Sequence, residues 1–256
     1  MNTSAILGLM PFRFLQELGK MVLFAITMGR NLIRRPPMPS AVLQHSYQVG
    51  IMSLPVLITV AVFVGSNTAL QGYSAFRPLG GQSLLGMFIG LAGLRELAPI
   101  IAATLIAAKV GTEMTTTLAV MRIREQIDAL EVMGVSPHWY LISPRLLAIG
   151  GMLPLLVLLA DFLCFSSGYL VSVHQLHVDP GAFLSNALEY ISIKDIGVGI
   201  VKGGVFGVCI CTISCYYGFN ASGGAAGVGR AANQAVVASA VTVMMVNFVL
   251  SEIFYG

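Results

Sequence analysis

The stretch RLLAIGGMLPLLVLLADFLCFSSGYLVS, residues 145–172, is long enough and apolar enough to cross a lipid bilayer as one helix. A helix needs about 20 apolar residues for this, because each residue advances it by about 1.5 Å. Between its first residue, Arg145, and its last, the only charged side chain is that of Asp161. A helix satisfies its own backbone hydrogen bonds, which hydrocarbon cannot do. The stretch therefore predicts a membrane-spanning helix.

Four further stretches have the same character. They lie near residues 43–65, 82–108, 196–217 and 233–254. None shows the short alternation of apolar and polar residues that is typical of membrane β-barrels. Over the whole chain, 56% of the residues are hydrophobic and 10% are charged, whereas a soluble domain carries about a quarter charged residues. The sequence predicts an all-α integral membrane protein with about five transmembrane helices in a domain over residues 38–256.

Residues 1–37 predict a different kind of helix. Apolar residues recur there at helical spacing, and charged residues interrupt every run before it is long enough to span a bilayer. The apolar positions are Phe14, Leu15, Leu18, Met21, Val22 and Ala25. This pattern is typical of an N-terminal amphipathic helix that lies in the membrane interface. Because two consecutive prolines cannot continue a helix, Arg34-Arg35-Pro36-Pro37 is expected to end it.

Basic residues near the ends of the spans predict the orientation of the chain, because Lys and Arg accumulate in cytoplasmic loops. With five alternating spans, one side of the membrane receives Arg30, Arg34, Arg35, Arg122, Arg124, Arg145 and Arg230. The other side receives Arg77 and Lys194. We therefore expect a cytoplasmic N-terminus and a C-terminus outside.

Composition and span number also bear on partners. The net charge of +3 is small, and basic residues do not alternate with aromatic ones, so nucleic-acid binding is not expected. Five spans cannot form two equal halves. A cavity with two-fold symmetry would therefore require a homodimer, and two-fold dimers are the commonest assembly.

The segment MRIREQIDALEVMG, residues 121–134, predicts a short amphipathic helix between the second and third spans. Its apolar and charged side chains fall on separate stripes, Gly134 suits a C-cap, and Pro137 follows where a helix should stop. Periodicity alone leaves two interpretations, an ordinary solvated helix or a docking helix for a cytoplasmic partner. The charged side chains that would dock are Arg122, Arg124, Glu125, Asp128 and Glu131.

Charged residues inside the predicted spans are informative, because each is costly unless it is paired or faces a wet cavity. Glu96 lies in the second span and Lys202 in the fourth. They could form a structural ion pair or line a central cavity. Pro99 cannot donate a hydrogen bond to the Arg95 carbonyl, so a kink is expected beside Glu96. An alternative function is an ion-coupled secondary transporter that uses Glu96 and Asp161 as relay groups.

The sequence offers little support for catalysis on this chain. GAAGVGRA, residues 224–231, comes close to a P-loop, but Arg230 and Ala231 replace its lysine and its hydroxyl residue. No cofactor is therefore expected here, and any ATPase would have to be another chain. His174, His177 and Asp179 lack the close spacing of a metal site, so none is expected. A membrane enzyme is disfavoured because no nucleophile and base gather at one face.

Several motifs resemble the signature of MlaE-type ABC transporter permeases. They are RELAPI (95–100), EQIDALEVMGVSP (125–137), SPRLL (143–147), the glycine-rich loop at 218–232, and VNFVL (246–250). The resemblance implies a permease domain over residues 38–256 in the bacterial inner membrane, working as a homodimer. Its partners would be a cytoplasmic ABC ATPase, which would bind ATP and Mg²⁺, a periplasmic MCE-domain carrier and often a STAS-domain protein. Its cargo would be phospholipid, in the service of outer-membrane lipid homeostasis and asymmetry.

The resemblance also implies which residues act. The helix at 122–134 would couple to the ATPase. Glu96 and Lys202 would line a lipid cavity, with Lys202 attracting a phosphate group. The apolar wall, at the junction of the first two spans, would comprise Leu70, Tyr73, Phe76 and Leu79. Asn247 stands where the resemblance implies an aspartate, so the cavity would carry one negative charge fewer.

Overall fold

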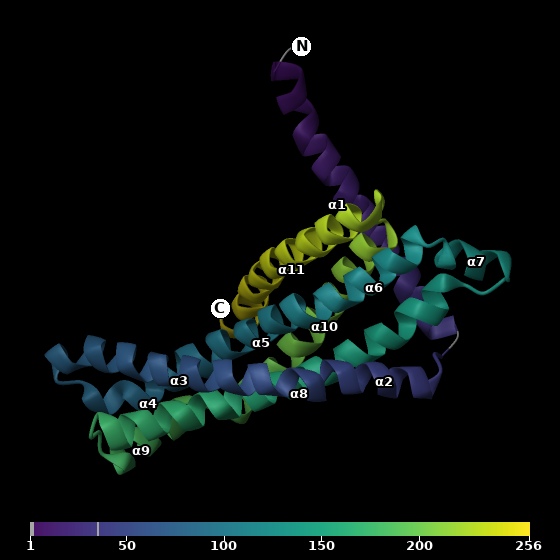
Figure 1. Ribbon diagram of the computed structural model, residues 1–256. Coiled ribbons are helices and arrows are strands. Elements are labelled where there is room, and N and C mark those ends of the chain that lie inside the picture. The colour runs from purple at the N-terminus through teal and green to yellow at the C-terminus, as the bar shows by residue number, and fades with distance from the viewer. Residues whose placement is uncertain (1–2, 35) are drawn as a thin grey trace.

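The computed structural model describes residues 3–34 and 36–256, and every regular element in these residues is a helix. Five long helical rods pack into a bundle (Figure 1). The prediction of an all-α membrane protein is confirmed. The side chains of residues 3–15, 18, 33 and 34 lie outside the described part. The predicted positions Phe14, Leu15, Leu18, Arg34 and Arg35 are among the residues left out.

The rods are made of the following elements. The first contains α2 (Pro39–Val49), η1 (Ile51–Ser53), α3 (Leu54–Phe76) and η2 (Arg77–Leu79). The second contains η3 (Gln82–Leu84), α4 (Leu85–Phe88), the π-helix η4 (Ile89–Leu97), α5 (Ala98–Ile106), the π-helix η5 (Ala107–Gly111) and α6 (Thr112–Ile123). The third contains η6 (His138–Ile142), α8 (Ser143–Leu170) and η7 (Val171–Gln175). The fourth is α10 (Ile193–Phe219) and the fifth is α11 (Gly224–Tyr255).

Each predicted span falls inside one rod, but the first rod is longer than the 43–65 expected. It continues to Leu79 although polar residues follow position 65. The hydroxyls of Ser66, Thr68 and Ser74 each donate to the carbonyl four residues earlier, at 2.8–2.9 Å. Polar side chains that bond their own backbone in this way remain compatible with a helix in an apolar environment.

The bundle is centred on α8 and α10. Helix α8 packs against α2 and α3 on one side and against α10 on the other, and α10 also contacts α6 and α11. Buried Leu153, Val157 and Phe206 belong to the main apolar core of the described residues. Helix α11 is the least enclosed of the five rods, and Met244, Met245 and Phe248 on it are exposed.

Glycine allows α3 and α8 to approach closely. A Cβ atom on Gly65 would lie 2.0 Å from the carbonyl oxygen of Cys164, and one on Gly168 would lie 3.3 Å from the carbonyl oxygen of Gly65. Small residues at such crossings permit the backbone contacts that hold membrane helices together, because lipid offers no hydrophobic driving force between helices.

Gly65→Ala is therefore expected to destabilise the bundle by about 1–3 kcal/mol, the usual cost of overpacking. Thermal unfolding in detergent would measure the change. Gly150→Ala is the matched control, because a Cβ atom there meets no atom within 4 Å. Equal melting temperatures for the two variants would show that the backbone crossing is not close.

Two short helices outside the rods mark opposite ends of the bundle (Figure 1). Helix α7 (Gln126–Val132) follows the second rod, and α9 (Pro180–Tyr190) lies between the third and fourth. Helix α9 was not predicted. Asp179 caps it by accepting a 2.7 Å hydrogen bond from the backbone of Ala182, and buried Phe183 packs it onto α4. An Asp-Pro pair at this point is a typical helix start.

Helix α1 (Thr3–Arg34) diverges from the bundle at its N-terminal end (Figure 1). Its other half contacts the bundle, where Phe24 packs against the rings of His138 and Phe219. Glu17 pairs with Lys20 at 2.8 Å and accepts a 2.7 Å hydrogen bond from the Tyr216 hydroxyl. These two hydrogen bonds, the Lys20 one being the larger effect, hold the pKa of Glu17 below its ordinary value. The position of helix α1 in the membrane interface stays a prediction.

The glycine-rich stretch forms the start of α11 instead of a phosphate-binding loop. Gly223 and Gly224 have positive φ angles of 89° and 66°, which glycine adopts readily. Gly227 then packs so closely on the preceding turn that a Cβ atom would lie 1.9 Å from the Ser222 carbonyl oxygen. The glycines thus serve a tight turn and a close backbone contact.

Candidate functional site

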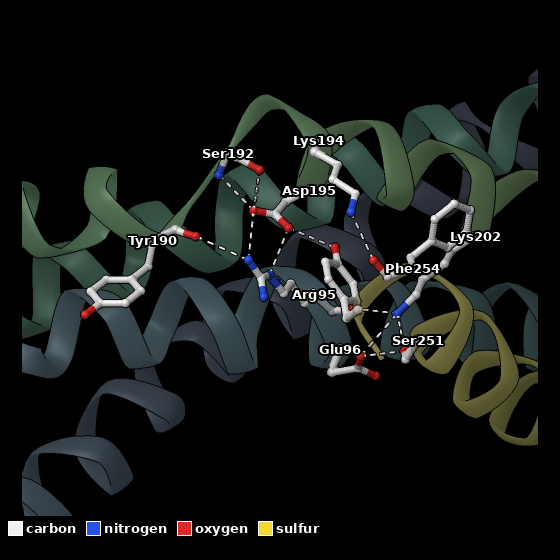
Figure 2. Close-up of polar contacts among 10 residues, drawn as sticks. Arg95, Glu96, Tyr190, Ser192, Lys194, Asp195, Lys202, Ser251 and Phe254 are labelled. Atoms are coloured by element: carbon white, nitrogen blue, oxygen red, sulfur yellow. Dashed lines mark hydrogen bonds and ion pairs between the residues drawn. The ribbon is translucent and has the colours of Figure 1, made fainter.

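A network of polar side chains begins where the second rod departs from α geometry. In η4 the Ala98 N–H donates to the Gly93 carbonyl, five residues earlier. Pro99 has no N–H, so the Arg95 carbonyl lacks its usual donor four residues on. The Lys202 ammonium on α10 fills this place at 2.8 Å (Figure 2). The proline predicted to disturb the helix therefore leaves the Arg95 carbonyl free to accept a hydrogen bond from the buried Lys202.

The inner layer of the network surrounds Glu96. Lys202 is fully buried, and it donates to Glu96 Oε1 at 3.2 Å and to Ser251 Oγ at 2.8 Å. Ser251 donates to Glu96 Oε1 at 2.6 Å, and Asn247 Nδ2 donates to Glu96 Oε2. All three ammonium protons thus have acceptors within the chain. The ion-pair alternative describes this arrangement, and a lipid phosphate would have to displace one of these partners to reach Lys202.

The outer layer surrounds Asp195, near the start of α10. Arg95 Nε lies 2.8 Å from Asp195 Oδ1, and the guanidinium sits 4.4 Å from the centre of the Tyr255 ring. The Tyr255 hydroxyl donates to Asp195 Oδ1 at 2.9 Å. Asp195 also accepts a 2.8 Å hydrogen bond from the Ser192 backbone N–H, which completes a capping box. One carboxylate therefore caps the start of α10 and joins this helix to η4 and α11.

Helical spacing explains how three rods meet in two layers. Asp195 and Lys202 are seven residues apart on α10, and Asn247, Ser251 and Tyr255 follow one another at intervals of four on α11. Residues at these intervals lie on one face of a helix. We call the set Arg95, Glu96, Asp195, Lys202, Asn247, Ser251 and Tyr255 the polar network. Sequence reasoning missed Arg95, Asp195, Ser251 and Tyr255, although the spacing from Asn247 could have indicated the last two.

The predicted apolar wall lies elsewhere in the described chain. Tyr73 packs with the core shared by α4 and α9, and the Phe76 ring meets that of Phe88 at 5.7 Å. Leu70 and Leu79 are exposed. Among the described residues, no hydrogen bond, ion pair or ring contact joins these four to the polar network. Their place in a cavity with Glu96, Lys202 and Asn247 stays a prediction that requires a second chain.

The predicted coupling segment is shorter and more sharply bent than the expected helix over 122–134. Arg122, in the last turn of α6, pairs with Asp128 on α7, while Glu125 has a positive φ angle of 58° that separates the two helices. Arg124 and Glu131 are exposed, and neither forms an ion pair within 4.0 Å among the described residues. The end of α7 projects apolar Val132 and Met133, which are 89% and 66% exposed.

A five-rod helical bundle with charges buried between its rods is a multi-pass membrane protein, and comparison with known proteins specifies its kind. The chain belongs to the MlaE family, because the model of that family, described as permease MlaE, matches residues 42–253.

The chain is similar to probable ABC transporter permease proteins. One from Rickettsia felis is 35% identical over 100% of this chain and 98% of the relative. One from Synechocystis is 34% identical over 83% of this chain and 81% of the relative. The chloroplastic protein TRIGALACTOSYLDIACYLGLYCEROL 1 of Arabidopsis thaliana is 34% identical over 83% of this chain and 61% of the relative. The chain is thus a permease subunit of an ABC transporter, with an ATPase as its partner, and the ion-coupled alternative is not retained.

Proposed function

We propose that this permease moves phospholipid between the bacterial inner membrane and a periplasmic MCE-domain carrier, and so contributes to outer-membrane lipid asymmetry. The observation that carries the proposal is the position of Glu96. The Glu96 side chain is 36% exposed and accepts a hydrogen bond from Asn247 on α11. Met244 and Phe248, also on α11, expose apolar surface beside Asn247. A polar group beside apolar helices suits a molecule that has both a headgroup and acyl chains.

Two further observations support lipid cargo and a dimeric assembly. One relative is named after trigalactosyldiacylglycerol, a lipid with a polar headgroup on a diacylglycerol. The exposed face of α11 leaves room for a second copy, which would place two polar networks around one cavity. We propose a homodimer whose Leu70, Tyr73, Phe76 and Leu79 complete the cavity wall, and a STAS-domain protein as a further subunit.

The distribution of basic residues supports a cytoplasmic position for the α7 end of the bundle. Arg122 and Arg124 flank the turn into α7, Arg145 lies near the start of the third rod, and Arg230 lies near the start of α11. Under the positive-inside rule this end faces the cytoplasm. The cytoplasmic ATPase would then dock on α7, and the C-terminal end of α11 would face the periplasm.

Reconstitution tests the proposal directly. The tagged permease is purified in mild detergent with its co-expressed neighbours, and bound proteins and lipids are identified by mass spectrometry. The complex is then placed in liposomes that contain fluorescent phospholipid, with the soluble MCE domain outside. We expect an ATPase and an MCE-domain protein to co-purify, and phospholipid transfer to require ATP. ATP-driven movement of another solute, without phospholipid transfer, would overturn the proposal.

A further inference from the structure

A second polar site lies at the α7 end of the bundle, outside the polar network. A pocket of about 300 Å³ opens between the start of α2 and the start of the third rod. Its polar and aromatic lining includes Ser40, Gln44 and His45 from the first rod and Trp139, Tyr140 and Arg145 from the third. A smaller pocket of about 80 Å³ shares His45 and Arg145 with it.

Arg145 is a buried cation without a counter-ion in the described chain. It is 6% exposed, and its one hydrogen bond to a described residue runs from Nη1 to the Leu141 carbonyl in the preceding turn. Among the described residues no carboxylate lies within 4.0 Å of it, although Glu113 lines the smaller pocket. A guanidinium carries five N–H donors and does not deprotonate in proteins. Burying such a charge without an anion is costly, so a negatively charged ligand is expected in the pocket.

The pocket lies at the depth where lipid headgroups are found. Arg145 is seven residues beyond His138, the first residue of the third rod, which corresponds to about 10 Å along a helix. Trp139 and Tyr140 stand at the start of that rod, and these residue types concentrate at the membrane–water boundary. Beside the pocket, Leu43 and Tyr47 on α2 are exposed and offer an apolar surface for acyl chains.

We propose that this pocket binds the phosphate of an anionic phospholipid headgroup, with Arg145 as its principal ligand. A guanidinium forms two parallel hydrogen bonds to a phosphate, which suits the unused donors of Arg145. Gln44, His45 and Ser40 supply further polar contacts to the phosphate or the glycerol. The pocket has the volume of a headgroup, so the acyl chains would lie outside it along α2. The site stands whether or not phospholipid is the cargo.

Native mass spectrometry of the full chain in mixed micelles tests the site. The probes are dioleoyl phosphatidylglycerol, dioleoylglycerol, which lacks the phosphate, and inorganic phosphate. Arg145→Gln removes the cation. Gln44→Glu keeps it but adds a carboxylate to the pocket, so it should exclude the phosphate without leaving a buried charge unpaired. Arg30→Gln is the control, because Arg30 is exposed on α1 and has no ion pair among the described residues.

We expect the unaltered chain and Arg30→Gln to retain one phosphatidylglycerol that both pocket variants bind at least tenfold more weakly. Dioleoylglycerol should not compete for it. Equal retention by all four proteins overturns the site. Displacement of the lipid by equimolar inorganic phosphate would assign the pocket to free phosphate, and displacement by the bound ATPase would make it a protein interface. Either result also overturns the proposal, and neither bears on ATP-dependent lipid transfer.

Discussion

Lys202→Met is expected to lower the free energy of unfolding of the permease by about 3 kcal/mol. Removal of one partner of a buried ion pair typically costs about 3–5 kcal/mol, because the other charge remains without compensation. The lower end applies here, since the Glu96 side chain is 36% exposed while that of Lys202 is fully enclosed. The variant also deprives the Arg95 carbonyl and Ser251 of their contacts with the ammonium group.

A double-mutant cycle separates this ion pair from simple loss of packing. Glu96→Gln in the Lys202→Met background removes the stranded carboxylate, so the double variant should recover at least half of the lost stability. Reversible unfolding in mixed micelles with increasing dodecyl sulfate would provide the four free energies. Lys194→Met makes the same chemical change at an exposed position on α10 and should cost about 0.5 kcal/mol or less. Additive losses in the double variant would contradict a coupled pair.

Val132→Asp is expected to weaken association with the ATPase by at least tenfold while the fold is kept. Val132 is 89% exposed at the tip of α7, beside exposed Met133, and makes no buried contact whose loss would unfold the chain. Central apolar residues dominate the energy of most protein interfaces, and a carboxylate placed there must be desolvated. Co-purification of the ATPase at several salt concentrations would measure the loss. This prediction rests on the proposed docking of the ATPase on α7.

The charged residues of the same segment provide the comparison. Glu131→Gln should change association less than threefold, because a solvated rim charge contributes little to affinity. Asp128→Asn acts differently, since Asp128 pairs with Arg122 inside the chain and positions α7 relative to α6. If Glu131→Gln abolished binding while Val132→Asp retained it, docking would depend on charge complementarity instead of the apolar tip.

Length and apolarity predicted the five rods because membrane spans are constrained by hydrocarbon thickness alone. Their ends were harder to predict. The first rod continues beyond residue 65 because hydroxyl side chains there donate hydrogen bonds to the helix backbone. The segment after the second rod is divided because Glu125 has a left-handed backbone conformation, although its periodicity suggested one helix. Helix α9 is too short for a span, and its only local signal was the pair Asp179-Pro180.

Part of the polar network could also be predicted. Glu96 and Lys202 were conspicuous because charges are rare in spans, and the structure brings them together with Asn247. The pairing of Arg95 with Asp195 depends on how two rods pack, which the periodicity of a single helix does not contain. The apolar wall remains untested for a related reason, because it would be completed by the surface of another chain.

The order of synthesis means that the polar network is completed last by α11. Asn247 and Ser251 supply two of the three side chains that donate hydrogen bonds to Glu96, and both belong to α11. Translation proceeds from the N-terminus, so α11 leaves the ribosome after the other four rods. Until it inserts, a carboxylate in the membrane keeps only Lys202 as its donor. A nascent permease stalled before α11 would therefore present an incompletely bonded charge to the lipid, a lesion that membrane proteases could recognise.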